Sequence, residues 1–350
     1  MKLDLDEQDL ALLHGMQIAP RVSWSAAASI LGSTPATIAA RWDRLRSDGL
    51  AWVTAHPAGA TLVVSLVEVD CRPESRAEVV RAVCADPRAA TVEESARDRD
   101  LLLTVMTPDL PELTRFALDE LSRIPGVQRT RTHLTTAIHW QGSSWRLDAL
   151  DPRQRAGFER VAAEAAAVPD TGPPPDAWLL IEALAHDGRA SAADLARLTG
   201  RNAATVRRQL PRLIASGLLA FRCEVAQVPS QWPISCTFVG RVPAPEHART
   251  AAALATLAEL RLCVSTTGSS NFMFTVWVRS LQRLLELERL LAEKLPWLGI
   301  VESAVTLRTP KRMGWMLDDR GRATGEVIPA TGLRAAGRRG QVAFTRRSAT

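Results

Sequence analysis

The distribution of hydrophobic and polar residues in the first 50 positions predicts three short helices. Residues 5–17 gather five apolar side chains near one helical face. A second, shorter helix ends at Gly32, and a third points Ile38, Trp42 and Leu45 inward at i, i+4 and i+7. Three helices joined by such tight turns predict a helix-turn-helix, whose third helix enters the major groove of DNA.

A different pattern follows in residues 57–142 and predicts a mixed sheet. Runs rich in β-branched and apolar residues predict four strands, at 59–71, 90–96, 100–107 and 127–140. Amphipathic helices are predicted between them at 73–87 and 110–127. The order strand, helix, strand, strand, helix, strand is that of a ferredoxin-like unit, an antiparallel sheet with helices on one face.

The uncovered face of such a sheet still carries apolar residues. Val63, Leu102 and Val105 are the candidates. Association with another sheet of the same kind would bury them. The partner sheet is either the second half of this chain, which makes an intramolecular pseudo-dimer, or another copy of it in a homo-oligomer.

The whole pattern occurs twice along the chain. Residues 21–53 and 189–221 align without a gap, every match 168 positions apart. The downstream segments 100–127 and 271–300 correspond more loosely, with two residues inserted near Trp297. The sequence therefore predicts a tandem duplication of a two-part unit.

Composition places the boundaries between the parts. The stretch 168–178 is rich in proline, which favours extended backbone and separates the two copies. The last residues are rich in glycine and arginine and poor in bulky apolar side chains, which predicts mobility. The predicted parts are helix-turn-helix 1 at 1–56, ferredoxin-like unit 1 at 57–142, a helix and linker at 143–175, helix-turn-helix 2 at 176–229, ferredoxin-like unit 2 at 230–316, and a mobile basic tail at 317–350.

Overall composition is that of a folded, soluble protein, with 46% hydrophobic and 23% charged residues. No run approaches the roughly 18 apolar residues of a membrane span, and the acidic start MKLDLDEQDL is unlike a secretory signal, so we expect a cytoplasmic protein without a membrane partner. Five cysteines without a C-x-x-C pair suggest buried thiols rather than a disulfide framework or a metal site. The net charge of +5 permits nucleic-acid binding but does not establish it.

The candidate DNA contacts lie on and before the third helix of each copy. Short hydroxyl side chains near a helix N-terminus can bond phosphates, and arginines can reach phosphates or guanine edges. In the first copy these candidates are Ser33, Thr34, Thr37, Arg41 and Arg44. In the second they are Arg201, Asn202, Thr205, Arg207, Arg208 and Arg212.

Pro211 interrupts the second copy of this helix. A proline inside a helix removes one hydrogen bond and costs about 3 kcal/mol. The candidate contacts up to Arg208 precede it, so we expect the turns from Ala203 to Leu210 to remain helical, with any kink after them.

These residues together resemble the Lrp/AsnC family of bacterial transcriptional regulators. The resemblance rests on the acidic start LDEQDLALL, on AASILGSTPATIAAR at 27–41, on RDRDLLLTV at 97–105 and on IPGV at 124–127. It implies an α+β fold of tandem winged helix-turn-helix domains, each followed by a ferredoxin-like (βαββαβ) RAM domain. It also implies a DNA-binding regulator that oligomerises, and a RAM domain that in many members binds an amino acid.

The resemblance further points to an effector loop between the second and third RAM strands, where the family pattern is Gly-x-x-Asp. The first copy keeps the acid but not the glycine, and the second keeps the glycine but not the acid. Glycine permits positive φ and close backbone approach there, and the acid can pair with an ammonium group. The candidate effector residues are Arg97, Asp98, Asp100, Gly268, Ser269, Ser270 and Asn271.

Siroheme decarboxylases resemble the same two-part architecture and provide an enzymatic alternative. Such an enzyme would need proton-transfer groups and cationic anchors for porphyrin carboxylates. The histidines in or near the RAM units are His56, His133, His139 and His247. No phosphate loop, nucleophile elbow or metal-spaced cluster accompanies them, so we expect a regulator rather than an enzyme, with double-stranded DNA as partner and neither a cofactor nor a metal.

Overall fold

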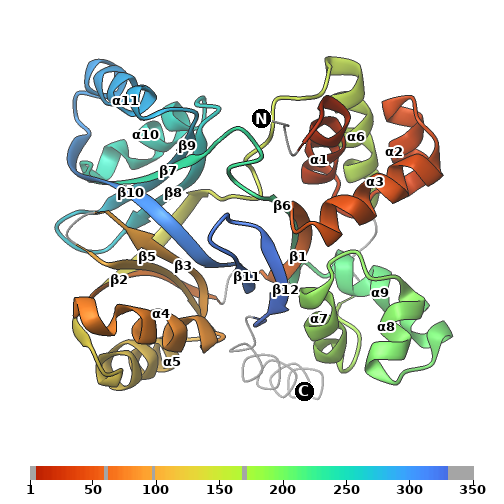
Figure 1. The fold of residues 1–350 in the computed structure, drawn as a ribbon, viewed down its shortest axis with the longest axis horizontal. Helices are drawn as coiled ribbons and strands as arrows, with labels where there is room; N and C mark the ends of the chain where they lie inside the picture. The colour runs from red at the N-terminus through yellow and green to blue at the C-terminus, as the bar shows by residue number, and fades with distance from the viewer. Residues whose placement is uncertain (1–4, 59–61, 97–98, 168–171, 330–350) are drawn as a thin grey trace, which may run out of the picture.

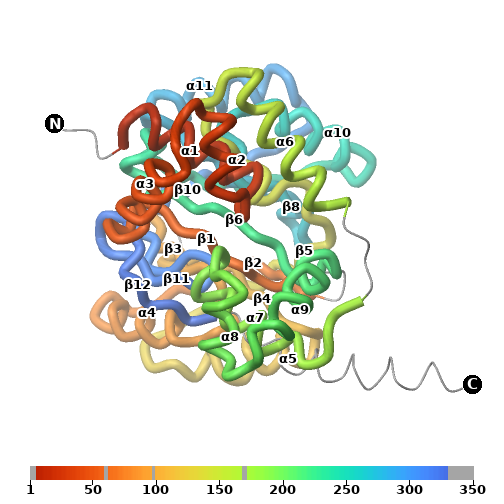
Figure 2. The backbone as a smooth tube through the Cα atoms, turned by 90° about the vertical axis from the view of Figure 1, so that its right-hand side faces the viewer, coloured from red at the N-terminus to blue at the C-terminus, as the bar shows by residue number. Residues whose placement is uncertain are grey.

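The computed structural model describes residues 5–58, 62–96, 99–167 and 172–329. Two helical units lie on one side of the molecule, and a large sheet covered by helices lies on the other (Figure 1). Two strands, β1 and β6, lie between the helical units (Figure 2).

The first helical unit begins with well-capped helices. Asp6 and Asp9 form a reciprocal capping box on its first helix, and Ser23 and Thr34 accept hydrogen bonds at the N-termini of the next two. Gly32 ends the second helix in the left-handed region, with φ of 66°. The elements are α1 (Glu7–Ile18), α2 (Trp24–Leu31), α3 (Pro35–Ser47) and β1 (Ala51–Pro57).

A further helix, α6 (Pro152–Ala166), packs against this unit. The sequence had instead grouped this helix with the linker at 143–175, which leads into the second half. Its Phe158 is fully buried in the hydrophobic core formed by α1, α2 and α3. A Cβ on residue 15 would lie 2.3 Å from the Phe158 ring, so the close packing of α6 on α1 requires Gly15.

The second helical unit repeats the first. Asn202 caps its third helix, and that helix continues through Pro211 as far as Ala215. Gly200 adopts φ of 67°, as Gly32 does in the first copy. The elements are α7 (Ala177–His186), α8 (Ala192–Thr199), α9 (Ala203–Ala215) and β6 (Leu219–Val225).

The strands that follow the two third helices pair with each other. β1 and β6 form an antiparallel two-stranded ribbon, with Trp52 opposite Glu224 and Thr54 opposite Arg222. Among the described residues, each helical unit therefore contributes one strand to a shared ribbon and has no β-hairpin wing of its own. The resemblance implied a wing in each domain; here the two copies supply one strand each.

Both ferredoxin-like units have the predicted order of elements. Three of the four helices are α-helical throughout, whereas α5 continues into a wider helical turn. The first unit contains β2 (Val63–Cys71), η1 (Pro73–Ser75), α4 (Arg76–Ala85), β3 (Ala89–Ser95), β4 (Leu101–Thr107), α5 (Leu110–Thr114) with η2 (Arg115–Glu120) and η3 (Leu121–Arg123), and β5 (Val127–Trp140). The second contains β7 (Ile234–Arg241), η4 (Ala244–Glu246), α10 (His247–Leu254), β8 (Leu260–Thr266), β9 (Phe272–Val278), α11 (Leu281–Lys294) and β10 (Gly299–Arg312).

The two sheets join within the chain into one closed sheet. β5 pairs with β8 at one seam, and β10 pairs with both β3 and β7. Helices α4 and α5 cover one outer face, and α10 and α11 cover the opposite one (Figure 1). The two sheets of one chain therefore pair with each other. The sequence had left open whether the partner sheet belongs to the same chain or to another copy.

The interior of the closed sheet holds a small apolar cluster. Leu66 and Leu102 of the first unit meet Val239, Val264 and Met273 of the second. The expected apolar face is thus buried between the two halves. It contains Leu102 but not the other two candidates, because Val63 and Val105 point the opposite way into the core beneath α4 and α5.

A short hairpin follows the closed sheet, where the sequence predicted a mobile tail from residue 317. β11 (Trp315–Leu317) pairs with β12 (Ala323–Val327). The Trp315 ring stacks on Trp52 of the ribbon at 5.9 Å between centroids, which explains why this segment is ordered. The rest of the predicted tail, 330–350, lies outside the described residues.

All five cysteines are unpaired and buried, in agreement with the sequence. Within the described ranges, no helix is both long and apolar enough to cross a membrane. Burial raises the pKa of the Cys223 thiol to about 12, so this group stays protonated at neutral pH.

Candidate nucleic-acid interface and effector loops

The third helix of the first copy, α3, presents its hydroxyl side chains to solvent. Ser33, Thr34 and Thr37 are exposed, and Thr34 bonds the backbone N–H of Thr37 as a helix cap. The hydroxyls of Thr34 and Thr37 also bond each other at 2.9 Å, so Ser33 presents the unengaged hydroxyl of the three among the described residues.

Two of the three arginines of α3, Arg41 and Arg44, are held by carboxylates at the start of the first helix. Arg41 forms ion pairs with Asp6 at 2.8 Å and Asp9 at 2.6 Å, and it donates to Gln8. Arg44 binds Asp9 at 2.6 Å. Burial alone would raise the pKa of Asp6, but the hydrogen bond from Arg41 holds it below its usual value. The charges of Arg41 and Arg44 are therefore neutralised within the first unit, whereas the third arginine of α3, Arg46, binds Asp187 of the second unit at 2.9 Å.

The third helix of the second copy, α9, presents two unpaired cations. Arg207 and Arg208 are exposed and make no hydrogen bond or ion pair within the part of the chain that the structure describes. They occupy the positions of Ala39 and Ala40 in the first copy. The positions that match Asp6 and Asp9 are Pro174 and Ala177, so α9 has no equivalent acidic partner there.

The other candidates of the second copy are more constrained. Arg201 donates to Gln209 and to the backbone carbonyl of Asp176. The Asn202 side chain caps α9 by accepting from the N–H of Ala204. Thr205 and Arg212 are half-buried. The exposed cationic surface of this helix thus centres on Arg207 and Arg208.

Two matching arginines fix the helical units to each other. Arg21 donates to the carbonyl oxygens of Gly188 and Ala190, and Arg189 donates to those of Pro20 and Val22. Because Arg21 and Arg189 are equivalent in the repeat, the contact is reciprocal. Together with the β1–β6 ribbon it sets a fixed spacing between α3 and α9.

The candidate effector residues Asp100 and Asn271 play matching structural roles. The Asp100 carboxylate accepts from the backbone N–H of Cys71 at 2.7 Å. The Asn271 side chain accepts from the N–H of Val242 and donates to its carbonyl, both at 2.9 Å. Each therefore holds the end of the strand that starts its unit. Arg97 and Asp98 lie outside the described residues.

Three of the second-copy candidates line a cavity of about 510 Å³. Gly268 adopts φ of 111°, a conformation that disfavours any side chain, so the family glycine is needed at this turn. Ser270 neighbours the cavity without lining it. The lining residues are Arg241, Val242, Pro243, Ala244, Gly268, Ser269, Asn271, Trp297 and Gly299.

Two of the histidines that the enzymatic alternative would use share one place, and the other two lie apart from them. His139 and His247 both bond the Ser265 hydroxyl, at 2.7 and 2.6 Å. His133 lies 3.4 Å from Glu68. His56 is on the ribbon and is 8% exposed.

Comparison with known proteins places these features in a family. The Lrp/AsnC ligand binding domain matches residues 64–144 and again 241–316, and the AsnC-type helix-turn-helix domain matches residues 5–46. The chain belongs to the Lrp/AsnC family. The double match shows the duplication of the RAM unit, whereas the second helical unit matches a different family, HVO_A0114, at residues 174–230.

Curated relatives of this Lrp/AsnC protein match less than half of it, over most of their own length. An uncharacterized HTH-type transcriptional regulator of Pyrococcus horikoshii is 29% identical over 142 residues, which is 39% of this chain and 89% of the relative. The HTH-type transcriptional regulator FL11 of Pyrococcus furiosus is 26% identical over 140 residues, 39% of this chain and 91% of the relative.

The full-length fold is similar to that of the siroheme decarboxylase NirDL. The alignment with the structure of NirDL in complex with an iron-uroporphyrin III analogue covers 95% of this chain and 98% of the NirDL chain, with a TM-score of 0.53 and 14% sequence identity. Identity this low shows a shared fold and not a shared activity.

The sequence did not reveal the acidic partners of α3. The available signal was the contrast between copies, since Asp6 and Asp9 lie on the first helix of one copy and have no acidic counterpart in the other. Recognising their role needed the packing of α1 against α3, which the structure supplies.

Proposed function

We propose that this Lrp/AsnC protein is a DNA-binding transcriptional regulator whose second helical unit makes the stronger contact with DNA. The observation that carries the proposal is the pair Arg207 and Arg208, exposed and unpaired on the third helix of a helix-turn-helix. Such cations release counterions from the phosphate backbone and so drive binding.

The first helical unit contributes more weakly in this proposal. Asp6 and Asp9 compensate Arg41 and Arg44, and their carboxylates would repel a nearby phosphate. The Ser33 hydroxyl remains available for a neutral hydrogen bond to DNA. The fixed spacing of α3 and α9 allows one chain to contact two half-sites.

Replacing the exposed arginines of α9 tests this assignment. We expect Arg207→Ala and Arg208→Ala each to weaken binding to the DNA upstream of the protein's own gene by roughly 1–3 kcal/mol, and each to lower the salt slope by about one. The measurement is a fluorescence-anisotropy titration with that duplex at several salt concentrations.

Arg289→Ala is the matched control, because Arg289 is an exposed arginine on α11, remote from both helical units (Figure 1). It should leave the binding constant unchanged. Equal losses for all three variants, or no preference of the parent protein for its upstream DNA over random duplex, would count against the proposal.

Releasing the arginines of α3 should have the opposite effect. Asp9→Asn keeps an oxygen that can accept the capping hydrogen bond from Asp6 but removes the charge that binds Arg41 and Arg44. We expect DNA affinity to rise by a few-fold, with a steeper salt dependence, in the same titration. If the DNA affinity falls while the stability of the helix is unchanged, Asp9 instead positions Arg41 and Arg44 for contact with DNA.

We place a small effector, such as an amino acid, in the cavity beside Gly268. In support, Arg241 and Trp297 line it with a cationic group and an aromatic face, which suit a carboxylate and an apolar side chain. The Asn271 amide is already bonded to Val242, so it is not free to replace the family acid in pairing with an ammonium group.

A second candidate function is decarboxylation of a tetrapyrrole, favoured by the full-length fold match to the siroheme decarboxylase. Against it, His139 and His247 are both bonded to the Ser265 hydroxyl, and His133 lies apart from them beside Glu68. Incubation with an iron porphyrin distinguishes the two functions. A stoichiometric, red-shifted Soret band followed by loss of carbon dioxide would favour the enzyme.

A further inference from the structure

Three arginines from different strands meet where the β1–β6 ribbon covers one end of the closed sheet. Arg222 lies on β6, Arg261 on β8 and Arg312 on β10. Arg261 and Arg312 are each only 6% exposed, and both stack on the Trp277 ring, at 4.1 and 5.0 Å. None of the three belongs to the DNA surface or to the effector cavity.

Two carboxylates lie beside these three arginines, Glu224 and Glu93, and burial raises the pKa of Glu93 although Arg312 and Arg261 oppose that shift. Glu224 binds Arg222 at 2.5 Å and Arg261 at 2.6 Å. Among the described residues, Arg312 donates hydrogen bonds to neutral oxygens alone, the carbonyl of Val225 at 3.5 Å and the side chain of Gln227 at 3.4 Å. Burial and the neighbouring Arg222 hold the pKa of Arg261 well below its usual value.

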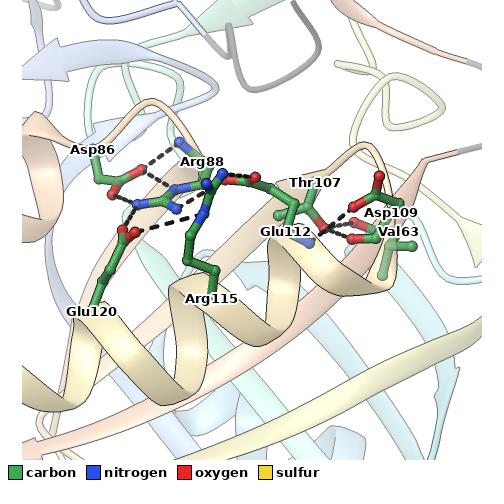
Figure 3. Close-up of polar contacts among 8 residues, drawn as sticks. All are labelled: Val63, Asp86, Arg88, Thr107, Asp109, Glu112, Arg115 and Glu120. Carbon is green, nitrogen blue, oxygen red and sulfur yellow. Dashed lines mark hydrogen bonds and ion pairs between the residues drawn. The ribbon is translucent and has the colours of Figure 1, made fainter. Parts of the chain in front are cut away.

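A partly buried arginine cluster elsewhere in the protein shows how carboxylates compensate an arginine. Arg88 contacts three carboxylates, those of Asp86, Glu112 and Glu120 (Figure 3). There the acids outnumber the cations even when Arg115 is included. Burying a charge without a partner is costly, so the deficit beside Arg312 calls for an additional anion.

Hydrogen-bond donors without acceptors surround the same place. The Gln227 Nε2 amide and the Trp52 Nε1 indole are buried and have no partner among the described residues, and these side chains are 9% and 1% exposed. Gln227 bonds Arg312 through its oxygen, and Trp52 lies opposite Glu224 on the ribbon. His56 Nδ1 and Trp315 Nε1 are likewise unpartnered. Unsatisfied donors are rare in protein interiors, and an oxyanion would satisfy them.

Side chains on the inner wall of the closed sheet remain partly accessible. Glu93 and Thr91 lie on β3 on either side of Val92, which packs in the core beneath α4 and α5, so both face inward. Leu262 packs against the inner apolar cluster and is also only partly buried. Part of the inner wall of the closed sheet is therefore not covered by neighbouring side chains.

We propose that the space beneath the β1–β6 ribbon binds a small multivalent oxyanion, carrying phosphate or carboxylate groups, through Arg222, Arg261 and Arg312. Arginine suits this role because its planar group donates two parallel hydrogen bonds to a phosphate or carboxylate. Gln227 Nε2 supplies a neutral donor beside Arg312.

Calorimetric titration of the full chain with inorganic phosphate and with citrate tests the site. We expect saturable binding at one site for at least one of them, and a dissociation constant raised roughly tenfold or more by Arg312→Met. Tighter binding of phosphate would identify a compact phosphate ligand, and tighter binding of citrate an extended polycarboxylate.

Arg308→Met is the matched control, since Arg308 lies on the same strand but binds Glu94. It should leave the dissociation constant unchanged.

Should Arg312→Met fail to fold, Gln227→Leu removes an unpartnered donor without removing charge and is expected to weaken binding several-fold. Absence of saturable binding of either anion up to about 10 mM, or equal effects of Arg308→Met and Arg312→Met, would overturn the proposal. A binding heat that sodium chloride reproduces at equal ionic strength would also overturn it.

Discussion

Glu224→Gln is expected to lower the free energy of unfolding by about 3–5 kcal/mol, because it removes the carboxylate that Arg222 and Arg261 share. Glu224 is 0% exposed, so water cannot replace it. Burial alone would raise the pKa of Glu224, but Arg222 and the other two arginines hold it below its usual value, so the group is ionised at neutral pH. The measurement is urea denaturation followed by circular dichroism.

Glu246→Gln is the control for this prediction, because Glu246 forms an exposed pair with Arg249 one helical turn away. Such a pair contributes no more than about 1 kcal/mol. The double variant Glu224→Met, Arg261→Met should recover part of the loss, since it removes an uncompensated cation. A loss for Glu224→Gln no larger than the control would show that the cluster is hydrated rather than buried.

Acidification from pH 6.5 to 4.5 is expected to remove about 2 kcal/mol of stability through His56 alone. Burial, with the nearby Arg222, lowers the pKa of His56 from 6.5 to about 4. The native state therefore stays unprotonated while the unfolded state takes up a proton below pH 6.5. Stability is complete above that value and falls as the pH approaches 4.

His14 adds to the same loss. Burial lowers its pKa to about 4, and its Nδ1 accepts a hydrogen bond from the N–H of Ala149, which protonation would break. The pH range of the measurement ends at 4.5, because protonation of carboxylates also changes the stability at lower pH. Burial would raise the pKa of Glu68, but hydrogen bonds from His133 and Arg131 lower it to about 2, so its stabilisation is lost only in stronger acid.

Urea denaturation at pH 6.5, 5.5 and 4.5 measures this linkage. His56→Gln should flatten the dependence by about 2 kcal/mol over the window, whereas His186→Gln, at an exposed position of α7, should leave it unchanged. Parallel curves for His56→Gln and the parent protein would show that His56 does not titrate on unfolding.

Much of the fold could be predicted because its signals are local. The helix end at Gly32, the inward face of Ile38, Trp42 and Leu45, and the order of strands and helices all agree with the structure. The repeat then extended these predictions to the second half of the chain. Such features depend on residues within one or two helical turns of each other, where periodicity and capping chemistry act directly.

The candidate site was less accessible to this reasoning. Exposure of an arginine on a helix can be predicted from its face, but its partners cannot. Arg41 and Arg208 looked alike in the sequence, yet one is bound by two carboxylates of another helix and the other has no partner among the described residues. Asp100 and Asn271 were predicted as effector contacts on a family pattern, and the structure shows that each holds a strand end.

The sequence by itself determined the duplication, the family resemblance and the succession of elements, because each of these follows from short-range patterns. Only the tertiary structure decided how the copies meet. The closed sheet, the reciprocal contacts of Arg21 and Arg189, and the cluster of Arg222, Arg261 and Arg312 join residues from separate parts of the chain. Contacts between distant residues depend on which surfaces pack together, and burial then sets the charge balance and the pKa of the groups enclosed.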